Sequence, residues 1–185
     1  MSWNPFWIHY YREMKKINYI ITLLLILIFN SALANQGGTK IPDLEIKMLN
    51  GQRTSIYKLL KKGPLLIDFW ATWCTPCKKL MVHLDDYHQK YTSDGFQVLM
   101  INQDTPRSLG KVKSYINSKK HKFLVAIDPN QQLAKKLNGQ IMPSLILVKP
   151  DASIVWRHQG FMPGEEKEIE HQIKLLLNEK RKVDE

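Results

Sequence analysis

Two cysteines separated by two residues, Cys74 and Cys77, constrain this chain more than any other feature, because the sequence contains no further cysteine. An apolar, strand-like run ends just before them, and a helical pattern begins at the second one. Unpaired backbone N–H groups and the macrodipole at a helix N-terminus stabilise the thiolate of the first cysteine. Pro76 fits the first helical turn, where its missing N–H is not needed. The pair predicts either a reversible disulfide or half of a metal site.

The other residues that could bind a metal do not complete a metal site, so the reversible disulfide is favoured. A zinc site would normally need a second Cys/His pair at ligand spacing, and none follows. His83 could join the two cysteines around copper, but this spacing differs from the C-x-x-x-C pair with a distant histidine found in copper chaperones. The other histidines after the cysteines are scattered, at positions 88, 121, 158 and 171, and we expect all five on the surface or on helices. We therefore expect no metal and no other cofactor.

A second distinctive segment lies about seventy residues past the cysteines, at residues 140–146, where Met142 and Pro143 precede an apolar run. A proline before such a run is compatible with an edge residue or with the start of a strand. From the residues alone, both interpretations stay open.

Residues 68–78, Asp-Phe-Trp-Ala-Thr-Trp-Cys-Thr-Pro-Cys-Lys, resemble the active-site segment of the thioredoxin superfamily. The form Trp-Ala-Thr-Trp-Cys-x-Pro-Cys is typical of the extracytoplasmic TlpA/ResA-type thiol–disulfide oxidoreductases. A bare Cys-x-x-Cys is weak evidence, whereas an eleven-residue match at a strand-to-helix junction is strong. The likeness covers roughly residues 41–178.

This resemblance implies a role for each residue near the cysteines. Cys74 would attack a partner disulfide, and Cys77 would resolve the mixed disulfide. Asp68 aligns with the buried aspartate of thioredoxins, which suits it to move the proton of the resolving cysteine, although a strand-end cap is the alternative. Many TlpA/ResA relatives carry Asn there and an acid on the following strand, where Asp104 could serve, unless it is a helix cap or a loop residue. The lysine that pairs with the aspartate in thioredoxins falls near Met100 and is absent.

The resemblance also implies a substrate-binding surface. The Met142–Pro143 bond should be cis, and the Met142 backbone should pair with an extended substrate segment. Relatives more often have Thr, Val or Ile before this proline, and the flexible thioether of Met142 suits varied peptide surfaces. Trp73, beside the cysteines, should flank the disulfide, with a plain core role as the alternative. We count Trp73, Thr75 and Pro76 with Met142 and Pro143 as substrate-binding residues, and we expect Trp70 to pack.

The order of the elements predicts an α/β fold. The resemblance sharpens this to a thioredoxin fold with a central mixed β-sheet flanked by helices, an N-terminal β-hairpin and a β-α insert. Asn50-Gly51 is the hairpin turn, Ser55 caps the first helix, and Thr105-Pro106 open a later one. Expected strands cover residues 44–49, 65–70, 96–101, 123–127, 144–148 and 153–156. Expected helices cover residues 56–61, 77–92, 106–116, 131–137 and 165–178.

The N-terminus has the layout of a secretory signal peptide. Lys15 and Lys16 precede an apolar core at residues 20–29, and small residues at 30–34 provide a cleavage site after Ala34. We expect a signal peptide at residues 1–34, with Met14 as a possible true start, followed by a thioredoxin-like domain at residues 35–185. The core is short for a spanning helix, which needs about 20 apolar residues, and an uncleaved anchor is the alternative.

The charge of the chain excludes one class of function. Lys and Arg outnumber Asp and Glu by 27 to 17, but they are spread along the sequence without a basic block. We expect no nucleic-acid partner. The resemblance instead implies a monomeric reductase in the periplasm or another extracytoplasmic compartment. Its partners would be oxidised exported proteins, with apocytochrome c among them, and a membrane thiol electron donor. The alternatives are a copper or haem-maturation metallochaperone that uses the same thiolates, and a docking module that keeps the disulfide as a clip.

Overall fold

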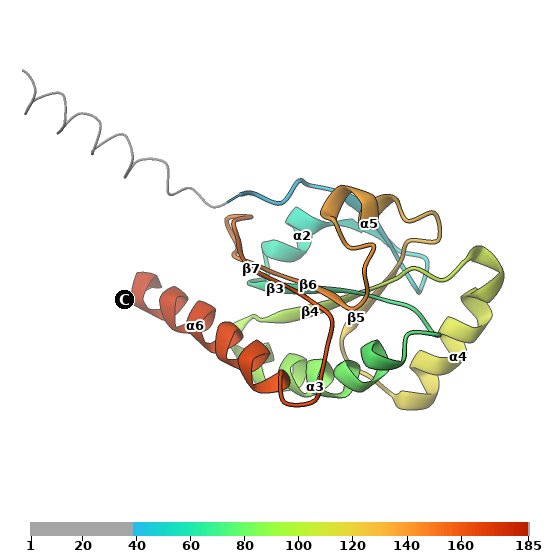
Figure 1. Ribbon diagram of the computed structural model, residues 1–185. Helices are drawn as coiled ribbons and strands as arrows, with labels where there is room; N and C mark the ends of the chain where they lie inside the picture. The colour runs from blue at the N-terminus through green and yellow to red at the C-terminus, as the bar shows by residue number, and fades with distance from the viewer. Residues whose placement is uncertain (1–38, 185) are drawn as a thin grey trace, which may run out of the picture. The chain divides into compact units, whose positions relative to one another are not determined.

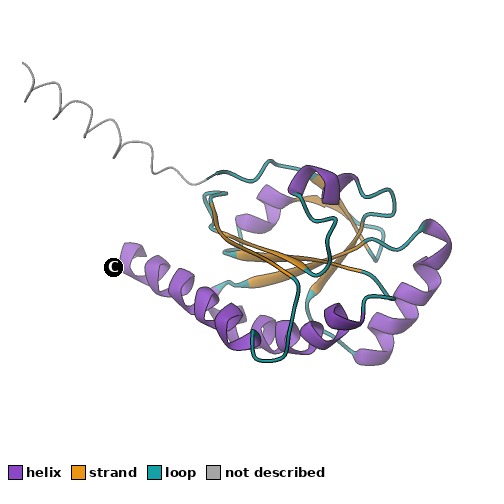
Figure 2. Ribbon diagram, viewed as in Figure 1, coloured by secondary structure: helices purple, strands orange, loops and turns teal. Residues whose placement is uncertain are grey.

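The computed structural model describes residues 39–184, with side chains up to residue 179. The expected signal peptide and the possible start at Met14 lie outside these residues. Within the described part, seven strands form one sheet in the order β2-β1-β5-β4-β3-β6-β7. Helices cover both faces of this sheet (Figures 1 and 2).

The bounds of the elements follow the expected order closely. The strands are β1 Glu45–Met48, β2 Arg53–Ser55, β3 Leu65–Trp70, β4 Gln97–Asn102, β5 Leu124–Ile127, β6 Ser144–Val148 and β7 Ile154–Gln159. The α-helices are α2 Ile56–Leu60, α3 Thr75–Tyr91, α4 Leu109–Lys119, α5 Gln132–Leu137 and α6 Glu166–Asp184, and 3₁₀ turns cover Thr92–Asp94 and Pro106–Ser108. No helix in this part of the chain combines the length and the apolar character that crossing a bilayer requires.

The predicted mixed sheet is confirmed. The central strands β3, β4 and β5 run parallel, and β6 runs antiparallel to both β3 and β7. The N-terminal hairpin of β1 and β2 joins the sheet beside β5. Between α4 and β6 the chain adds β5 and α5, which is the expected β-α insert.

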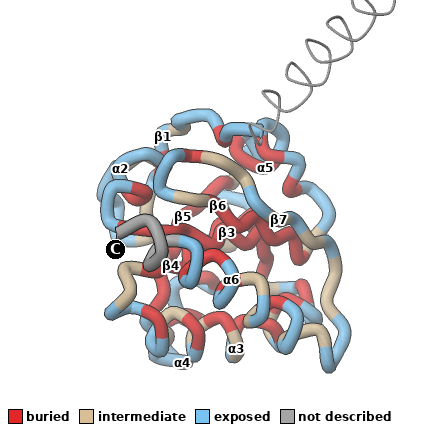
Figure 3. The backbone as a smooth tube through the Cα atoms, turned by 90° about the vertical axis from the view of Figure 1, so that its left-hand side faces the viewer, coloured by how far each residue is buried: buried red, intermediate tan, exposed pale blue. Residues whose placement is uncertain are grey.

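Strand β3 lies at the centre of the molecule, and all six of its residues are buried (Figure 3). Because side chains alternate along a strand, Leu66, Asp68 and Trp70 face one side and Phe69 faces the other. The first side carries the core under α3, α4 and α6, and the second carries the core under α2 and α5 (Figure 1). Asp68 is therefore a single carboxyl group in an apolar layer beneath α3.

Local details at the helix ends differ from the expectation. Ser55 caps α2 as predicted, since its hydroxyl accepts from the Lys58 N–H. Thr105 is the N-cap residue and Pro106 the first residue of the 3₁₀ turn before α4, as predicted, but the Thr105 side chain forms no capping hydrogen bond. The Ser108 N–H bonds to the Thr105 backbone carbonyl instead. The last helix runs to Asp184 rather than to about residue 178. No glycine or proline interrupts it, and charge alone does not end a helix.

Candidate redox site

The chain leaves β3 and turns directly into α3, and the two cysteines lie at this junction. The helix begins at Thr75, two residues earlier than expected, because Cys74 is itself the N-cap: its sulfur accepts from the Cys77 N–H at 3.3 Å. The two residues form a disulfide with Cα atoms 5.3 Å apart. Pro76 lies in the first helical turn as predicted.

The two sulfurs differ in access. Cys74 keeps 5% of its surface exposed, whereas Cys77 is 0% exposed and belongs to the core under α3. A partner can therefore approach the disulfide through Cys74 alone. This asymmetry agrees with an outer attacking sulfur and an inner resolving sulfur.

Asp68 lies in the apolar layer beneath α3 and is completely buried. Its register neighbours are Met100 on β4 and Leu145 on β6, so neither supplies a cation. Neither carboxyl oxygen forms a hydrogen bond of good geometry within the described residues. Loss of hydration raises the pKa of Asp68 well above its ordinary value, and the nearby backbone N–H groups of Ser144 and Phe69 oppose this only in part.

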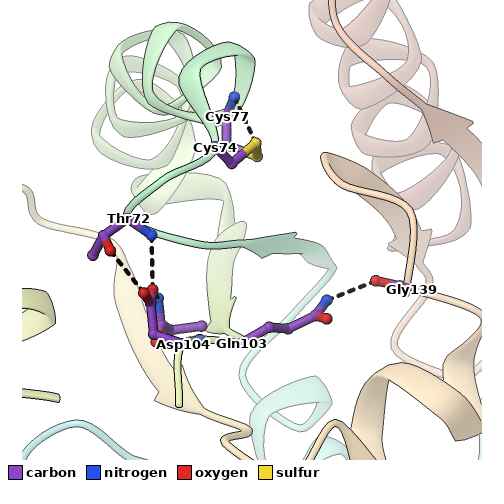
Figure 4. Close-up of a disulfide and its surroundings, with 7 residues drawn as sticks. Thr72, Cys74, Cys77, Gln103, Asp104 and Gly139 are labelled. Carbon is purple, nitrogen blue, oxygen red and sulfur yellow. Dashed lines mark hydrogen bonds between the residues drawn. A yellow bond between two sulfur atoms is a disulfide. The ribbon is translucent and has the colours of Figure 1, made fainter. Parts of the chain in front are cut away.

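Asp104 is buried in the loop that follows β4, so of the alternatives the loop residue is met and the helix cap is not. Its Oδ2 accepts from the Thr72 backbone N–H at 2.7 Å, and its Oδ1 accepts from the Thr72 hydroxyl at 2.7 Å. The amide of Asn102 donates to Oδ2 as well, at 2.8 Å. Asp104 thus braces the turn that leads into Cys74 (Figure 4).

Gln103 was not expected to contribute to the site. Its backbone N–H donates to the carbonyl of Trp70 at 2.9 Å, and its buried Nε2 donates to the carbonyl of Gly139 at 2.7 Å. Gly139 lies in the loop that leads to Pro143. A run of three polar residues, 102–104, directly after a buried strand was the available sequence signal.

The second half of the site is the loop before β6. The Met142–Pro143 peptide bond is cis, the isomer that the resemblance implies. Pairing of Ser144 with Phe69 brings this loop beside the end of β3. The carbonyl of Pro143 accepts from Gly160, and the half-buried Met142 contacts both core clusters.

Large apolar side chains project into solvent on the segments around the disulfide. Trp73 is 69% exposed, which excludes the alternative of a plain core role. Ile141 is 65% exposed one residue before Met142, and Met162 is 68% exposed just past Gly160. Thr75 and Pro76 are exposed as well. Trp70, in contrast, is fully buried with its ring 5.8 Å from that of Tyr115, which agrees with packing.

The histidines do not gather around the cysteines. His83 packs its ring 6.1 Å from Phe161. His88 lies on α3, as expected, and its Nδ1 accepts from the Val98 backbone N–H. His121 departs from the expectation, because it lies outside the helices and its largely buried side chain is 3.5 Å from Asp85. Across residues 39–184, no three His, Cys, Asp or Glu side chains come together as ligands for a metal ion.

Gly139 is held close to the core, and this gives a testable prediction. A Cβ atom on Gly139 would overlap the buried ring of Phe69. We expect Gly139→Ala to lower the free energy of unfolding by about 1–3 kcal/mol, measured by urea denaturation, because the buried ring has no free space to move into.

The matched control is Gly110→Ala, since nothing lies within 4 Å of a Cβ there. That change within a helix should raise stability by about 0.5–1 kcal/mol. Equal effects at the two glycines would contradict the close packing of the Gly139 loop.

Comparison with known proteins agrees with this geometry. A model of the Redoxin family matches residues 36–173. The thiol-disulfide oxidoreductase ResA of Bacillus thuringiensis is 26% identical over 155 residues, which cover 77% of this chain and 88% of that protein. ResA of Bacillus subtilis is 26% identical over 118 residues, covering 64% of each. A solved structure from Chlorobium tepidum, assigned as a thiol:disulfide interchange protein DsbE, has a TM-score of 0.70 and 27% identity, covering 77% of this chain and 98% of that one.

Proposed function

This chain belongs to the Redoxin family as a ResA/TlpA-like thiol–disulfide oxidoreductase, and we propose that it works outside the cytoplasm as a reductase of disulfides in exported proteins. The main support is the disulfide at the N-terminus of α3, in which Cys74 keeps a small exposed area of 5% and Cys77 is completely buried. A clip that only stabilised the fold would not need an accessible sulfur.

The reaction exchanges one disulfide for another. In the reduced protein, the thiolate of Cys74 attacks a sulfur of the partner disulfide; a mixed disulfide forms, and the other partner sulfur leaves as a thiolate that takes up a proton. Cys77 then attacks the sulfur of Cys74. The S–S bond between Cys77 and Cys74 forms, the bond to the partner breaks, and the second partner sulfur leaves as a thiolate that is then protonated. Two electrons pass from the protein to the partner. Cys77 gives up one proton, and solvent supplies the other, in place of the proton that Cys74 lost on ionising.

Asp68 is our candidate for the proton transfer in the second step. Cys77 must lose its proton before it attacks, and it lies in the same core cluster that surrounds Asp68. A carboxylate whose pKa is raised by burial binds a proton more readily than an ordinary carboxylate, and it can return that proton later. Asp104 is less suited to this role, because Thr72 and Asn102 occupy its oxygens.

Binding of the partner would use the loop before β6 and the exposed apolar side chains. An extended segment can pair with the Met142 backbone by strand addition, next to Pro143. Trp73, with Thr75 and Pro76 beside it, would contact the residues that flank the partner disulfide. The half-buried, flexible Met142 side chain suits partners of varied sequence.

The expected signal peptide at residues 1–34 supports export, and the periplasm is the compartment that we propose. Thiols are not kept reduced outside the cytoplasm, so a membrane thiol donor would have to reduce Cys74–Cys77 again. Oxidised exported proteins, including apocytochrome c, would be the substrates of a monomeric enzyme.

A redox titration of residues 35–185, followed by the fluorescence of Trp73 and Trp70, tests the direction of electron flow. We expect a reversible two-electron couple near that of thioredoxin, roughly −270 mV, because the proposed enzyme reduces its partners. A couple near about −120 mV would reverse the direction and make the protein an oxidant. If no reversible couple is found, the proposal is wrong.

A further inference from the structure

Residues 102–104, at the end of β4, touch both halves of the redox site. We call residues 71–74 the disulfide turn and residues 138–143 the cis-proline loop. Asp104 holds the disulfide turn through two hydrogen bonds from Thr72, and Gln103 holds the cis-proline loop through the carbonyl of Gly139 (Figure 4). The two segments lie 64 residues or more apart in the sequence.

The opposite directions of these two side chains follow from the backbone. Successive side chains of an extended chain point to opposite sides, and the Gln103 N–H continues the β3–β4 pairing by bonding to the Trp70 carbonyl. Gln103 therefore reaches one face of the sheet while Asp104 reaches the other. Asn102 fixes Asp104 further, since each donates a hydrogen bond to the other.

Both side chains are almost completely buried, with 4% of Gln103 and 3% of Asp104 exposed. A buried polar group stabilises a structure only through the bonds that it makes, and these bonds lead to the two segments that flank the disulfide. The disulfide turn and the cis-proline loop are thereby attached to one rigid strand end.

We propose that Gln103 and Asp104 are positioning residues of the redox site. Asp104 fixes the turn that presents Cys74, and Gln103 fixes the loop whose backbone pairs with the partner. Together they hold the attacking sulfur and the partner-binding backbone at a constant spacing. The Gln103 half rests on the proposed function, because it assumes that the partner pairs beside Pro143.

The two contacts predict different kinetic defects. Loss of the Gln103 contact should weaken binding of a protein disulfide and leave the reactivity of Cys74 unchanged. Loss of the Asp104 contact should lower the reactivity of Cys74 toward every disulfide, large or small. A role in folding alone would produce neither pattern.

Gln103→Met removes the donor at similar volume. We expect KM for reduction of insulin to rise about 3- to 10-fold, with kcat and the rate of reaction with the small disulfide DTNB unchanged. Amide hydrogen exchange at Ile141, Met142 and Ser144 should also become faster. The matched control is Gln97→Met, because the Gln97 side chain makes an equivalent buried bond to the Leu59 carbonyl at the other end of β4. Gln97→Met should lower the free energy of unfolding and leave KM for insulin unchanged.

Asp104→Ala should slow the reaction of Cys74 with both insulin and DTNB by about 3- to 10-fold. Asp104→Asn tests position against charge, because an asparagine can still accept from the Thr72 N–H and can donate to the Thr72 hydroxyl. We expect it to restore the rates to within about twofold of the unaltered protein. Asp85→Ala is the control, since Asp85 also accepts from two backbone N–H groups, those of Lys122 and Phe123, but far from the disulfide.

Three outcomes would overturn the proposal. Equal KM values for Gln103→Met and Gln97→Met, together with equal hydrogen exchange, would make Gln103 a residue of the fold only. Equal rates for Asp104→Ala and Asp85→Ala would do the same for Asp104. Equal defects in Asp104→Ala and Asp104→Asn would point to charge rather than position. If the unaltered protein fails to reduce insulin, the proposed function is wrong, while the DTNB and exchange measurements still decide the positioning roles.

Discussion

Replacing Cys74 with serine should abolish reduction of protein disulfides, with a loss on the order of 1,000-fold or more, because the remaining thiol, Cys77, is completely buried. Replacing Cys77 with serine should give a different result. Cys74, the more accessible of the two residues, keeps its position at the start of α3, so the first attack still proceeds. The reaction then stops, because no second sulfur is present to release the partner.

The measurement that separates the two variants is trapping. Cys77→Ser incubated with an oxidised protein should accumulate as a mixed disulfide, visible on a non-reducing gel and reversed by dithiothreitol, whereas Cys74→Ser should not. The buried Cys77 should also react with iodoacetamide more slowly than Cys74 in the reduced protein. Efficient trapping by Cys74→Ser would reverse the assigned roles. Thermal melts of both variants show whether either change has disturbed the fold.

The part of the site that sequence analysis predicted depends on local pattern. An apolar run, two cysteines at helix-start spacing and a proline in the first turn determine the β3–α3 junction without reference to distant residues. Burial of Asp68 follows from its place in a strand whose neighbours are all apolar. The cis-proline loop was different: the residues alone left Pro143 ambiguous, and only the resemblance implied its isomer.

The contacts of Gln103 and Asp104 could not be predicted, because they depend on which strands are neighbours. A polar run after a strand is compatible with a solvated loop. Only the parallel pairing of β3 with β4 brings residues 102–104 beside the disulfide turn. Trp73 was expected beside the disulfide, but a core role stayed open, because an aromatic residue next to a buried strand is compatible with either core or surface.

Asp68→Asn should slow resolution of the mixed disulfide by about 10- to 100-fold at pH 7, because the amide cannot take the proton of Cys77. The rate of partner release, measured by stopped flow as a function of pH, should lose the titration step that Asp68 contributes in the unaltered protein. The rate at which Cys74 first attacks DTNB should change little. A pH profile equal to that of the unaltered protein would exclude Asp68 as the proton-transferring group.

The same substitution has an expected effect on stability, whose sign follows from the raised pKa of Asp68. The unfolded chain ionises near the ordinary value of 3.8, whereas the folded protein keeps the carboxyl protonated to higher pH. The folded state therefore binds more protons, so the stability linked to Asp68 is complete below pH 3.8 and is lost as the pH rises through its folded pKa. Asp68→Asn should accordingly unfold at higher urea than the unaltered protein at pH 7, and this gain should vanish near pH 4.

Asp128→Asn is the control, because the backbone N–H groups of Gln132 and Ala134 occupy the Asp128 carboxyl. Asp128→Asn should lower the free energy of unfolding by about 1 kcal/mol at neutral pH. The two carboxylate oxygens each accept one hydrogen bond, whereas the nitrogen of an amide cannot accept one. We expect Asp68→Asn to be more stable than the unaltered protein but slower in resolution, and Asp128→Asn to be less stable but fully active. This pair of results would identify Asp68 as a carboxyl group whose burial lowers the stability of the fold and serves the reaction.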